Sequence, residues 1–207
     1  MSSGEVTERT DPGTFAAVLG EAAKIAESEG VPYGVFGSIA SAIWGRPAAS
    51  GDIDLFVRDH DARRLHAALG NHGFELSEEN PKWLLKAVKD GVLVDLIFKV
   101  RGDIYLDEEM EAHAVEAAYL DQRIRVLSAE DTLVVEAVSN EYETPDHWFN
   151  ALGILARQDP DWDYLLTRAR IGAKRVLSLL IYAQSTDIPI PNRYVRDLYR
   201  TVYEQET

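Results

Sequence analysis

Two acidic residues at alternate positions of an apolar segment are the side chains best placed to carry out chemistry in this sequence. The segment 52–57 reads DIDLFV, and the alternation of a β-strand would put Asp52 and Asp54 on one face of it. Neighbouring carboxylates repel each other unless a cation lies between them, and Mg²⁺ is the hard, oxygen-seeking cation that suits them. The pair therefore predicts a divalent-metal site.

A Gly-Ser pair precedes these acids. Gly37 and Ser38 stand between an apolar segment, 33–36, and a short helical pattern that continues to residue 44. Glycine lets the backbone approach an anion closely, and a serine at a helix N-terminus offers a hydroxyl and an N–H where negative charge is favoured. We therefore expect Gly37 and Ser38 to form an anion-binding turn next to the acids.

A third acid, Asp95, is set in the apolar run VLVDLIF. Asp90-Gly91 is a dipeptide preferred in two-residue hairpins, and such a turn would pair residues 82–89 with 92–99 and set Lys86 opposite Asp95. An unpaired carboxylate would be costly to bury there. Its counterion is therefore either Lys86 or a metal ion. One face of the hairpin is expected to be apolar: Trp83, Leu85, Ala87, Val94, Leu96 and Phe98.

In this order, the motifs resemble the DNA polymerase β-like nucleotidyltransferase superfamily. Its pattern is an apolar strand, Gly-Ser or Gly-Gly, a helix, Asp-apolar-Asp, and a third Asp on a neighbouring strand. The matching residues here are Gly37, Ser38, Asp52, Asp54 and Asp95. The resemblance implies an α+β fold, in which a mixed sheet has flanking helices and is followed by a C-terminal helical region.

The same resemblance implies a reaction, the transfer of a nucleoside monophosphate from an NTP to an acceptor with release of pyrophosphate. Two Mg²⁺ ions, with Mn²⁺ as the alternative metal, would be held by Asp52, Asp54 and Asp95. Nucleotide contacts are expected at Gly37, Ser38, Lys86 and Lys174. For Lys86, a salt bridge is the competing interpretation.

The small size and the helical C-terminal part are similar to minimal bacterial nucleotidyltransferases, including the AbiEii-like and MenT-like toxins. That similarity includes the stretch DHWFNAL at 146–152, and it implies a tRNA 3′ end as acceptor and an antitoxin as partner. The toxins usually carry Lys or Arg next to an Asp in this region, where this chain has His147 and Asn150. We expect His147, beside Trp148, to be packed structure.

A small molecule of the aminoglycoside type, or a protein hydroxyl that becomes AMPylated, is the alternative acceptor. A basic groove beside Asp95 would favour RNA. An acidic or neutral cleft would favour the smaller acceptor or a protein. The charge of the groove or cleft beside Asp95 is therefore the feature that separates the two classes.

Composition narrows the classes further. The 207 residues include no Cys, which excludes disulfides and thiolate zinc sites. Lys and Arg number 21 against 35 Asp and Glu, a net charge of −14, which argues against broad nonspecific binding to nucleic acid. The sequence has no apolar run of membrane-spanning length, and Met1–Glu5 does not have the character of a signal peptide. We expect a cytoplasmic protein.

A basic island in this acidic chain has two interpretations. It consists of Arg168, Arg170, Lys174 and Arg175. It could be a solvated helix face balanced by Asp159, Asp161 and Asp163, or a grip on the triphosphate or on RNA. Arg168 and Arg175 would share a face if one helix continued through Gly172.

The expected elements place the acids in the first part of the chain. Strands are expected at 33–36, 52–57, 74–76, 82–89, 92–99 and 124–127. Helices are expected at 14–29, 38–44, 129–140, 146–157, 161–184 and 192–204, and a further helix is expected to end at 71. Asp59 or Asp61 would cap the helix that ends at 71, and Ser128 would cap the helix at 129–140. A break is expected at Gly172. We expect a catalytic domain over residues 1–127 and a helical region over residues 128–207.

Overall fold

The computed structural model describes residues 11–47 and 50–204, and the Met1–Glu5 segment lies outside them. The chain folds as a mixed α/β protein around a seven-stranded sheet with strand order β3-β4-β5-β2-β1-β7-β6. Two pairs, β2 with β5 and β1 with β7, are parallel, and the other neighbours are antiparallel. The predicted fold class is confirmed.

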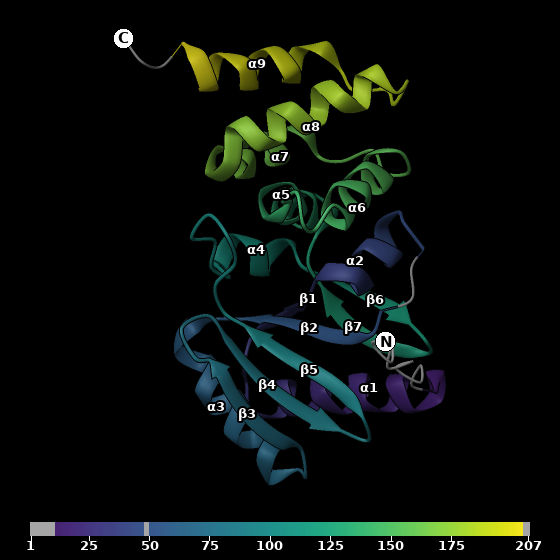
Figure 1. Ribbon diagram of the computed structural model, residues 1–207, viewed down its shortest axis with the longest axis vertical. Helices are drawn as coiled ribbons and strands as arrows, with labels where there is room; N and C mark the ends of the chain where they lie inside the picture. Colours follow the sequence, from purple (N-terminus) through teal and green to yellow (C-terminus); the bar gives the residue numbers. More distant parts are fainter. Residues whose placement is uncertain (1–10, 48–49, 205–207) are drawn as a thin grey trace, which may run out of the picture.

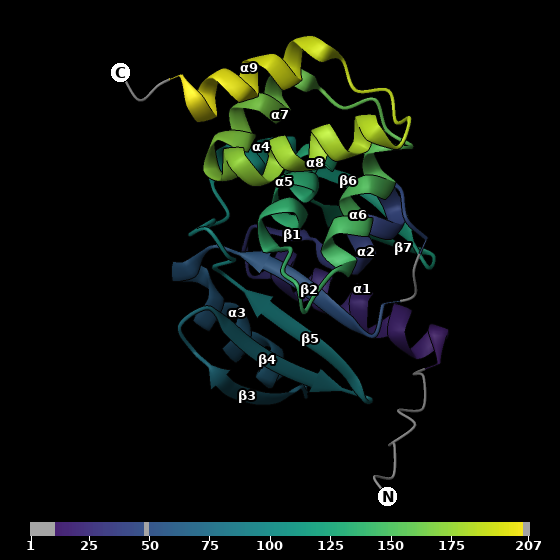
Figure 2. The ribbon, with the colours of Figure 1, turned by 45° about the horizontal axis from the view of Figure 1, so that its top comes forward.

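The strands are β1 (Tyr33–Val35), β2 (Asp52–Val57), β3 (Glu75–Asn80), β4 (Leu84–Lys89), β5 (Val92–Ile97), β6 (Val115–Tyr119) and β7 (Gln122–Val126). The helices are α1 (Pro12–Ser28), α2 (Gly37–Trp44), α3 (Asp59–Asn71), α4 (Glu108–His113), α5 (Ala129–Ser139), α6 (Asp146–Leu155), α7 (Trp162–Ala169), α8 (Ala173–Ser185) and α9 (Asn192–Tyr203). Helices α1 and α3 lie on one side of the sheet, and α5 to α9 are stacked on the other (Figures 1 and 2). No helix in these described ranges is both long and apolar enough to cross a bilayer.

Strand β2 carries buried apolar residues on one face and the acids on the other. Ile53 and Leu55 are fully buried in the cluster formed with α1 and α3. Asp52 and Asp54 alternate with them and face the other side, as predicted from the period of two. Phe56, on that same side, joins the core formed by the C-terminal helices. The acids therefore lie at the end of a strand that both cores hold in place.

The β4–β5 hairpin has the predicted turn and register. Asp90 and Gly91 both have positive φ, of 50° and 76°, as a type I′ turn requires. Lys86 lies opposite Asp95. Five of the six residues predicted for the apolar face are buried, but Trp83 is 41% exposed. The prediction for Trp83 was wrong because this residue lies in the turn before β4: its N–H bonds to the Asn80 carbonyl, although its own carbonyl still accepts from the Phe98 N–H.

Helix α5 begins at the residue predicted for it, Ala129. Ser128 caps α5 by accepting a hydrogen bond of 3.0 Å from the Asp131 N–H. The break expected at Gly172 separates α7 from α8 through a 3₁₀ turn at Arg170–Gly172. A Cβ on Gly172 would lie 2.2 Å from Val138 Cγ2, so the close packing of this turn on α5 requires glycine. Arg168 and Arg175 are therefore on different helices and do not share a face.

Some local expectations failed. Helix α3 begins at Asp59 with Arg58 as its N-cap residue and without a side-chain cap, so Asp59 and Asp61 are first-turn residues instead of caps. Acidic side chains there complement the helix dipole. The edge strand predicted at 74–76 extends from Glu75 to Asn80. Helix α4 and strand β6 had not been predicted; their sequences, EEMEAH and VEAAY, have little apolar periodicity.

Candidate active site

The three predicted acids meet at one point of the sheet. Strands β2 and β5 pair in parallel with Asp54 beside Asp95, and Asp52 is two residues earlier on the same face of β2. One carboxylate oxygen from each of Asp52, Asp54 and Asp95 lies within 4.8 Å of the others. The predicted convergence of the three carboxylates is confirmed.

This cluster carries more negative charge than its surroundings compensate. Burial raises the pKa of Asp54 well above its usual value, and the charges of Asp52 and Asp95 add to the effect. Burial also raises the pKa of Asp95, while Lys86 opposes that rise. Burial first, and repulsion between the carboxylates second, therefore disfavour the ionised forms of Asp54 and Asp95.

Lys86 only partly compensates Asp95. Its Nζ lies 3.9 Å from Asp95 Oδ1 and 3.9 Å from Glu79 Oε2, which makes ion pairs but is too long for hydrogen bonds. Asp95 Oδ1 is buried and has no hydrogen-bond partner among the described residues. Three converging carboxylates with one such oxygen form a donor set that fits a hard divalent cation such as Mg²⁺.

Gly37 allows the turn beside these acids. Its φ is +61°, and a Cβ there would lie 2.3 Å from Asp54 Oδ2, so both the backbone conformation and the space require glycine. Helix α2 begins at Gly37 and continues with Ser38, and the preceding Phe36 makes no side-chain cap hydrogen bond. The first amides of α2 therefore remain available to an anion next to Asp54.

A pocket of about 650 Å³ opens beside Gly37 and Asp54. Four basic side chains line it: Lys82, Lys99, Arg101 and His147. Phe36 and the half-exposed Trp83 supply aromatic surface. A pocket with one acid, several basic groups and aromatic rings suits a nucleotide, which combines phosphates with a flat base.

Sequence reasoning had not identified these basic residues as ligand contacts. In the predicted hairpin register, which sets Lys86 opposite Asp95, Lys82 and Lys99 fall on the same face as Asp95, and this was the available signal for them. Arg101 follows the hairpin and had no such signal. His147 was expected to be packed structure, but its side chain is 37% exposed and lines the pocket.

The other predicted contacts lie elsewhere. Lys86 is beside Asp95 and pairs with it. Lys174 does not line the pocket beside Asp54; it lines a neighbouring pocket of about 470 Å³ together with Arg101 and Arg175. Arg101 is common to both pockets, so the two adjoin at that residue.

The interpretation of Arg168 as a ligand grip or a solvated residue was wrong. Its side chain is only 6% exposed, and it forms ion pairs with Asp107 at 2.8 Å, Glu109 at 3.3 Å and Asp131 at 2.9 Å. These acids come from α5 and from the start of α4, and none is among the Asp residues proposed from the sequence. A guanidinium enclosed by three carboxylates binds the protein's own acids and has no free face for phosphate.

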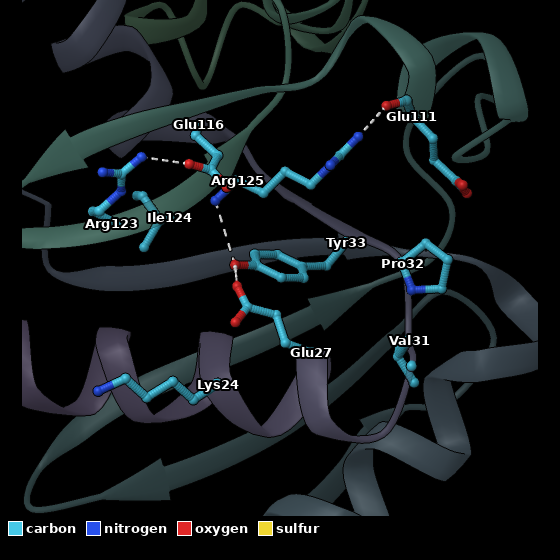
Figure 3. Close-up of a pocket in the computed structure, with 11 residues that line it drawn as sticks. Lys24, Glu27, Val31, Pro32, Tyr33, Glu111, Glu116, Arg123, Ile124 and Arg125 are labelled. Atoms are coloured by element: carbon cyan, nitrogen blue, oxygen red, sulfur yellow. Dashed lines mark hydrogen bonds and ion pairs between the residues drawn. The ribbon is translucent and has the colours of Figure 1, made fainter.

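Another pocket, of about 670 Å³, lies between α1, β7 and α4 (Figure 3). Several of its polar side chains bond within the pocket: Arg123 forms an ion pair with Glu116, Arg125 donates to the Glu111 carbonyl, and the Tyr33 hydroxyl donates to Glu27 (Figure 3). None of the three clustered acids lines it. The pocket beside Asp54, which contains one of these acids, is therefore the better candidate for the chemistry.

Two solved structures are similar to this arrangement of elements. The antibiotic-resistance factor ANT(2″)-Ia is 16% identical, with a TM-score of 0.53 over 85% of this chain and 94% of its own. An antigenic nucleotidyltransferase-like protein from Paracoccidioides brasiliensis is 14% identical, with a TM-score of 0.52 over 82% of this chain and 92% of its own. At these identities the likeness establishes the fold.

The sequence of this chain matches one family of proteins. No curated protein matches the chain significantly. The sequence profile described as uncharacterised nucleotidyltransferase matches residues 37–185, a range that begins at the glycine beside Asp54, includes all three acids, and extends to the end of α8. Because the match spans well over half of the 207 residues, the chain belongs to this nucleotidyltransferase family.

Proposed function

We propose that this protein transfers a nucleoside monophosphate from an NTP to an acceptor hydroxyl, using Asp52, Asp54 and Asp95 as its catalytic residues. The convergence of the three carboxylates within 4.8 Å, beside the uncapped start of α2, carries this proposal. In the reaction, a bond forms between the acceptor oxygen and the α-phosphorus, and the bond from that phosphorus to pyrophosphate breaks. The acceptor loses its proton.

Each residue has a distinct role in this proposal. Asp52 and Asp54 would hold two Mg²⁺ ions, or Mn²⁺, together with Asp95. When bound, these ions would neutralise phosphate charge and lower the pKa of the acceptor hydroxyl. Asp95 would complete the ion on the acceptor side and would receive the acceptor's proton. Gly37 and Ser38 present the first amides of α2 to the phosphates.

We also propose the division into a catalytic domain, 1–127, and a helical region, 128–207. The two parts would cooperate in one site. Ser139 and His147, from the second part, line the same pocket as Gly37 and Asp54.

For the acceptor, we propose a small molecule that carries a hydroxyl and is neutral or positively charged. On the β4 side of Asp95, the sheet continues past Lys86 to its edge strand β3, which has the sequence ELSEEN. Glu79 from β3 shares Lys86 with Asp95, and its charge contributes to the raised pKa of Asp95. This acidic surface repels a phosphate backbone and attracts amines. The fold shared with ANT(2″)-Ia, described as an antibiotic-resistance factor, agrees with an acceptor of this kind.

A tRNA acceptor, with an antitoxin as partner in the manner of AbiEii-like and MenT-like toxins, is the second candidate. It is favoured by one observation, that Arg101 joins the pocket beside Asp54 to the pocket with Lys174 and Arg175. Against it, Arg168 is committed to internal ion pairs.

The test is to supply each of the four NTPs, labelled at the α-phosphate, with Mg²⁺ and one of three cell fractions: small molecules, total RNA or protein. We expect label in the small-molecule fraction with stoichiometric release of pyrophosphate, and neither with the Asp54→Asn variant. Label in RNA would select the second candidate. Absence of label from every fraction would contradict nucleotidyl transfer.

A further inference from the structure

A buried carboxylate on α5 connects three elements behind the active site. Glu136 is only 2% exposed. Its Oε1 accepts hydrogen bonds from Ser41 Oγ at 2.9 Å and from Asn150 Nδ2 at 3.3 Å, and its Oε2 lies 2.6 Å from His147 Nδ1. Burial of a carboxylate at this depth requires partners of this kind. The roles proposed for Asp52, Asp54 and Asp95 do not explain why Glu136 and its partners are arranged in this way.

The network sets the orientation of His147. Because Nδ1 is directed at Glu136, the opposite edge of the imidazole ring, which carries Nε2, is turned away from α5. The ring is partly exposed and lines the pocket that also contains Gly37 and Asp54. The hydrogen bond to Glu136 raises the pKa of His147, so the ring is protonated over a wider pH range and both nitrogens then donate.

The same carboxylate positions the start of α2. Ser41, which donates to Glu136, lies one turn after the Gly37–Ser38 turn. Glu136 thus holds the anion-binding end of α2 and the His147 ring in one arrangement. Arg46, which follows the C-terminal end of α2, forms a second link to α6, because its Nη1 donates a hydrogen bond to Asn150 Oδ1 at 2.8 Å. Glu136 therefore positions two positive groups, the N-terminus of α2 and the imidazolium of His147.

We infer that His147 binds the phosphates of the NTP that leave as pyrophosphate, and that Glu136 acts as its positioning residue. This inference rests on the proposed nucleotidyl transfer. The transferred phosphorus must lie at Asp52, Asp54 and Asp95, so the remaining two phosphates extend from there into the pocket. The other charged groups of that pocket, Lys82, Lys99 and Arg101, give it the positive character that pyrophosphate requires.

His147 supplies something that its basic neighbours do not. Lys99 pairs with Asp103 at 2.6 Å, and Arg101 pairs with Glu141. Both of these acids are surface groups on turns, and lysine and arginine have longer side chains with more rotatable bonds than histidine. His147 is oriented by a buried acid and has a short side chain, so its Nε2–H donates from a fixed position. A fixed donor loses little entropy when a phosphate binds.

The test uses inorganic tripolyphosphate with Mg²⁺ as a probe, because it requires no knowledge of the base. Binding would be measured by calorimetry for the wild type, His147→Gln, Glu136→Gln and the double variant. His60→Gln, a change at an exposed histidine on α3, is the matched control. Circular dichroism and thermal melting would establish that each variant is folded.

We expect His147→Gln to weaken tripolyphosphate binding about tenfold, as for loss of a charge-assisted hydrogen bond. Glu136→Gln should weaken it to a similar extent, because the amide keeps the shape and removes the charge that holds His147 protonated. The double variant should be no worse than the singles. His60→Gln should bind as the wild type does. AMP binding should be unchanged in His147→Gln, since AMP lacks the leaving phosphates.

Two results would overturn the inference. Wild-type tripolyphosphate affinity in a folded His147→Gln variant would exclude the contact. An equal loss for AMP and tripolyphosphate would assign His147 to the nucleoside or to general structure. If the proposed nucleotidyl transfer itself were wrong, a different result would be seen: the wild type would neither bind tripolyphosphate with Mg²⁺ nor transfer label from any NTP. If label transfer persists while His147→Gln binds normally, only the role of His147 is wrong.

Discussion

Asp54 and Asp95 lie side by side, in register, on the adjacent parallel strands β2 and β5. They come from segments that are distant in the sequence, and both have raised pKa values. Two acids placed in this way destabilise each other unless a cation joins them. We therefore expect both activity and stability to depend on a divalent cation.

Asp54→Asn should abolish nucleotidyl transfer and leave the fold intact. The amide keeps the shape of the side chain and removes the charge, so we expect a loss of at least about a thousandfold in rate. Release of pyrophosphate from labelled NTP measures it. Asp59→Asn, at the first turn of α3, is the control and should be fully active. Near-normal turnover of a folded Asp54→Asn variant would reject the assignment.

Without divalent cations, the contribution of the triad to stability should fall as pH rises. Asp54 and Asp95 hold their protons to higher pH in the folded state than in the unfolded chain. Their contribution is therefore most favourable below the ordinary Asp pKa, and it is lost as pH rises through the raised values. Thermal melting in EDTA from pH 4 upward, compared between the wild type and Asp54→Asn, measures this. The variant should lose less stability over the range.

Mg²⁺ should stabilise the wild type at neutral pH. A cation at ten times its dissociation constant contributes about 1.4 kcal/mol, which corresponds to roughly 3–5 °C in Tm for a chain of this size. The Tm of Asp54→Asn should rise much less with Mg²⁺. Equal shifts in both proteins would place the bound cation away from the triad.

Gly37→Ala should damage both stability and activity. Its φ of +61° strains any side chain, and the new Cβ would meet Asp54 Oδ2. We expect about 1–3 kcal/mol lost in the free energy of unfolding, and activity reduced further by the displaced carboxylate. Gly73→Ala is the matched control, because Gly73 has φ +86° with open space around it. It should lose stability alone, so equal activity loss in the two variants would contradict a specific role for Gly37.

Arg168→Met should destabilise the protein by about 3–5 kcal/mol, because it leaves Asp131, which is fully buried, without its ion pair. Urea unfolding measures the change. Arg175→Met is the comparison, since Arg175 is exposed and donates to the Asn140 carbonyl; it should cost less than about 1 kcal/mol. If Arg168→Met kept its stability and instead weakened binding of NTP or RNA, the internal role would be wrong.

Much of the local structure could be predicted from the order of the residues. The alternation of DIDLFV places Asp52 and Asp54 on one face, and Asp90-Gly91 sets Lys86 opposite Asp95. These relationships depend on the backbone period and on a turn of two residues, so neighbours in the sequence are sufficient for them. The boundaries of β2 and the break at Gly172 follow from the same kind of local signal.

The environment of each side chain depended on contacts between distant segments. Arg168 belonged to a basic island in the sequence but is buried against Asp107, from the start of α4, a helix with no clear sequence signal. His147 belonged to an aromatic stretch and had no visible partner, because Glu136 meets it only when α5 packs on α6. Periodicity shows which face of an element a residue occupies, but the charge and burial of that face depend on which element packs against it. For the same reason, the neighbour relation of Asp54 and Asp95 arises from the parallel pairing of β2 with β5, a long-range choice that no local pattern encodes.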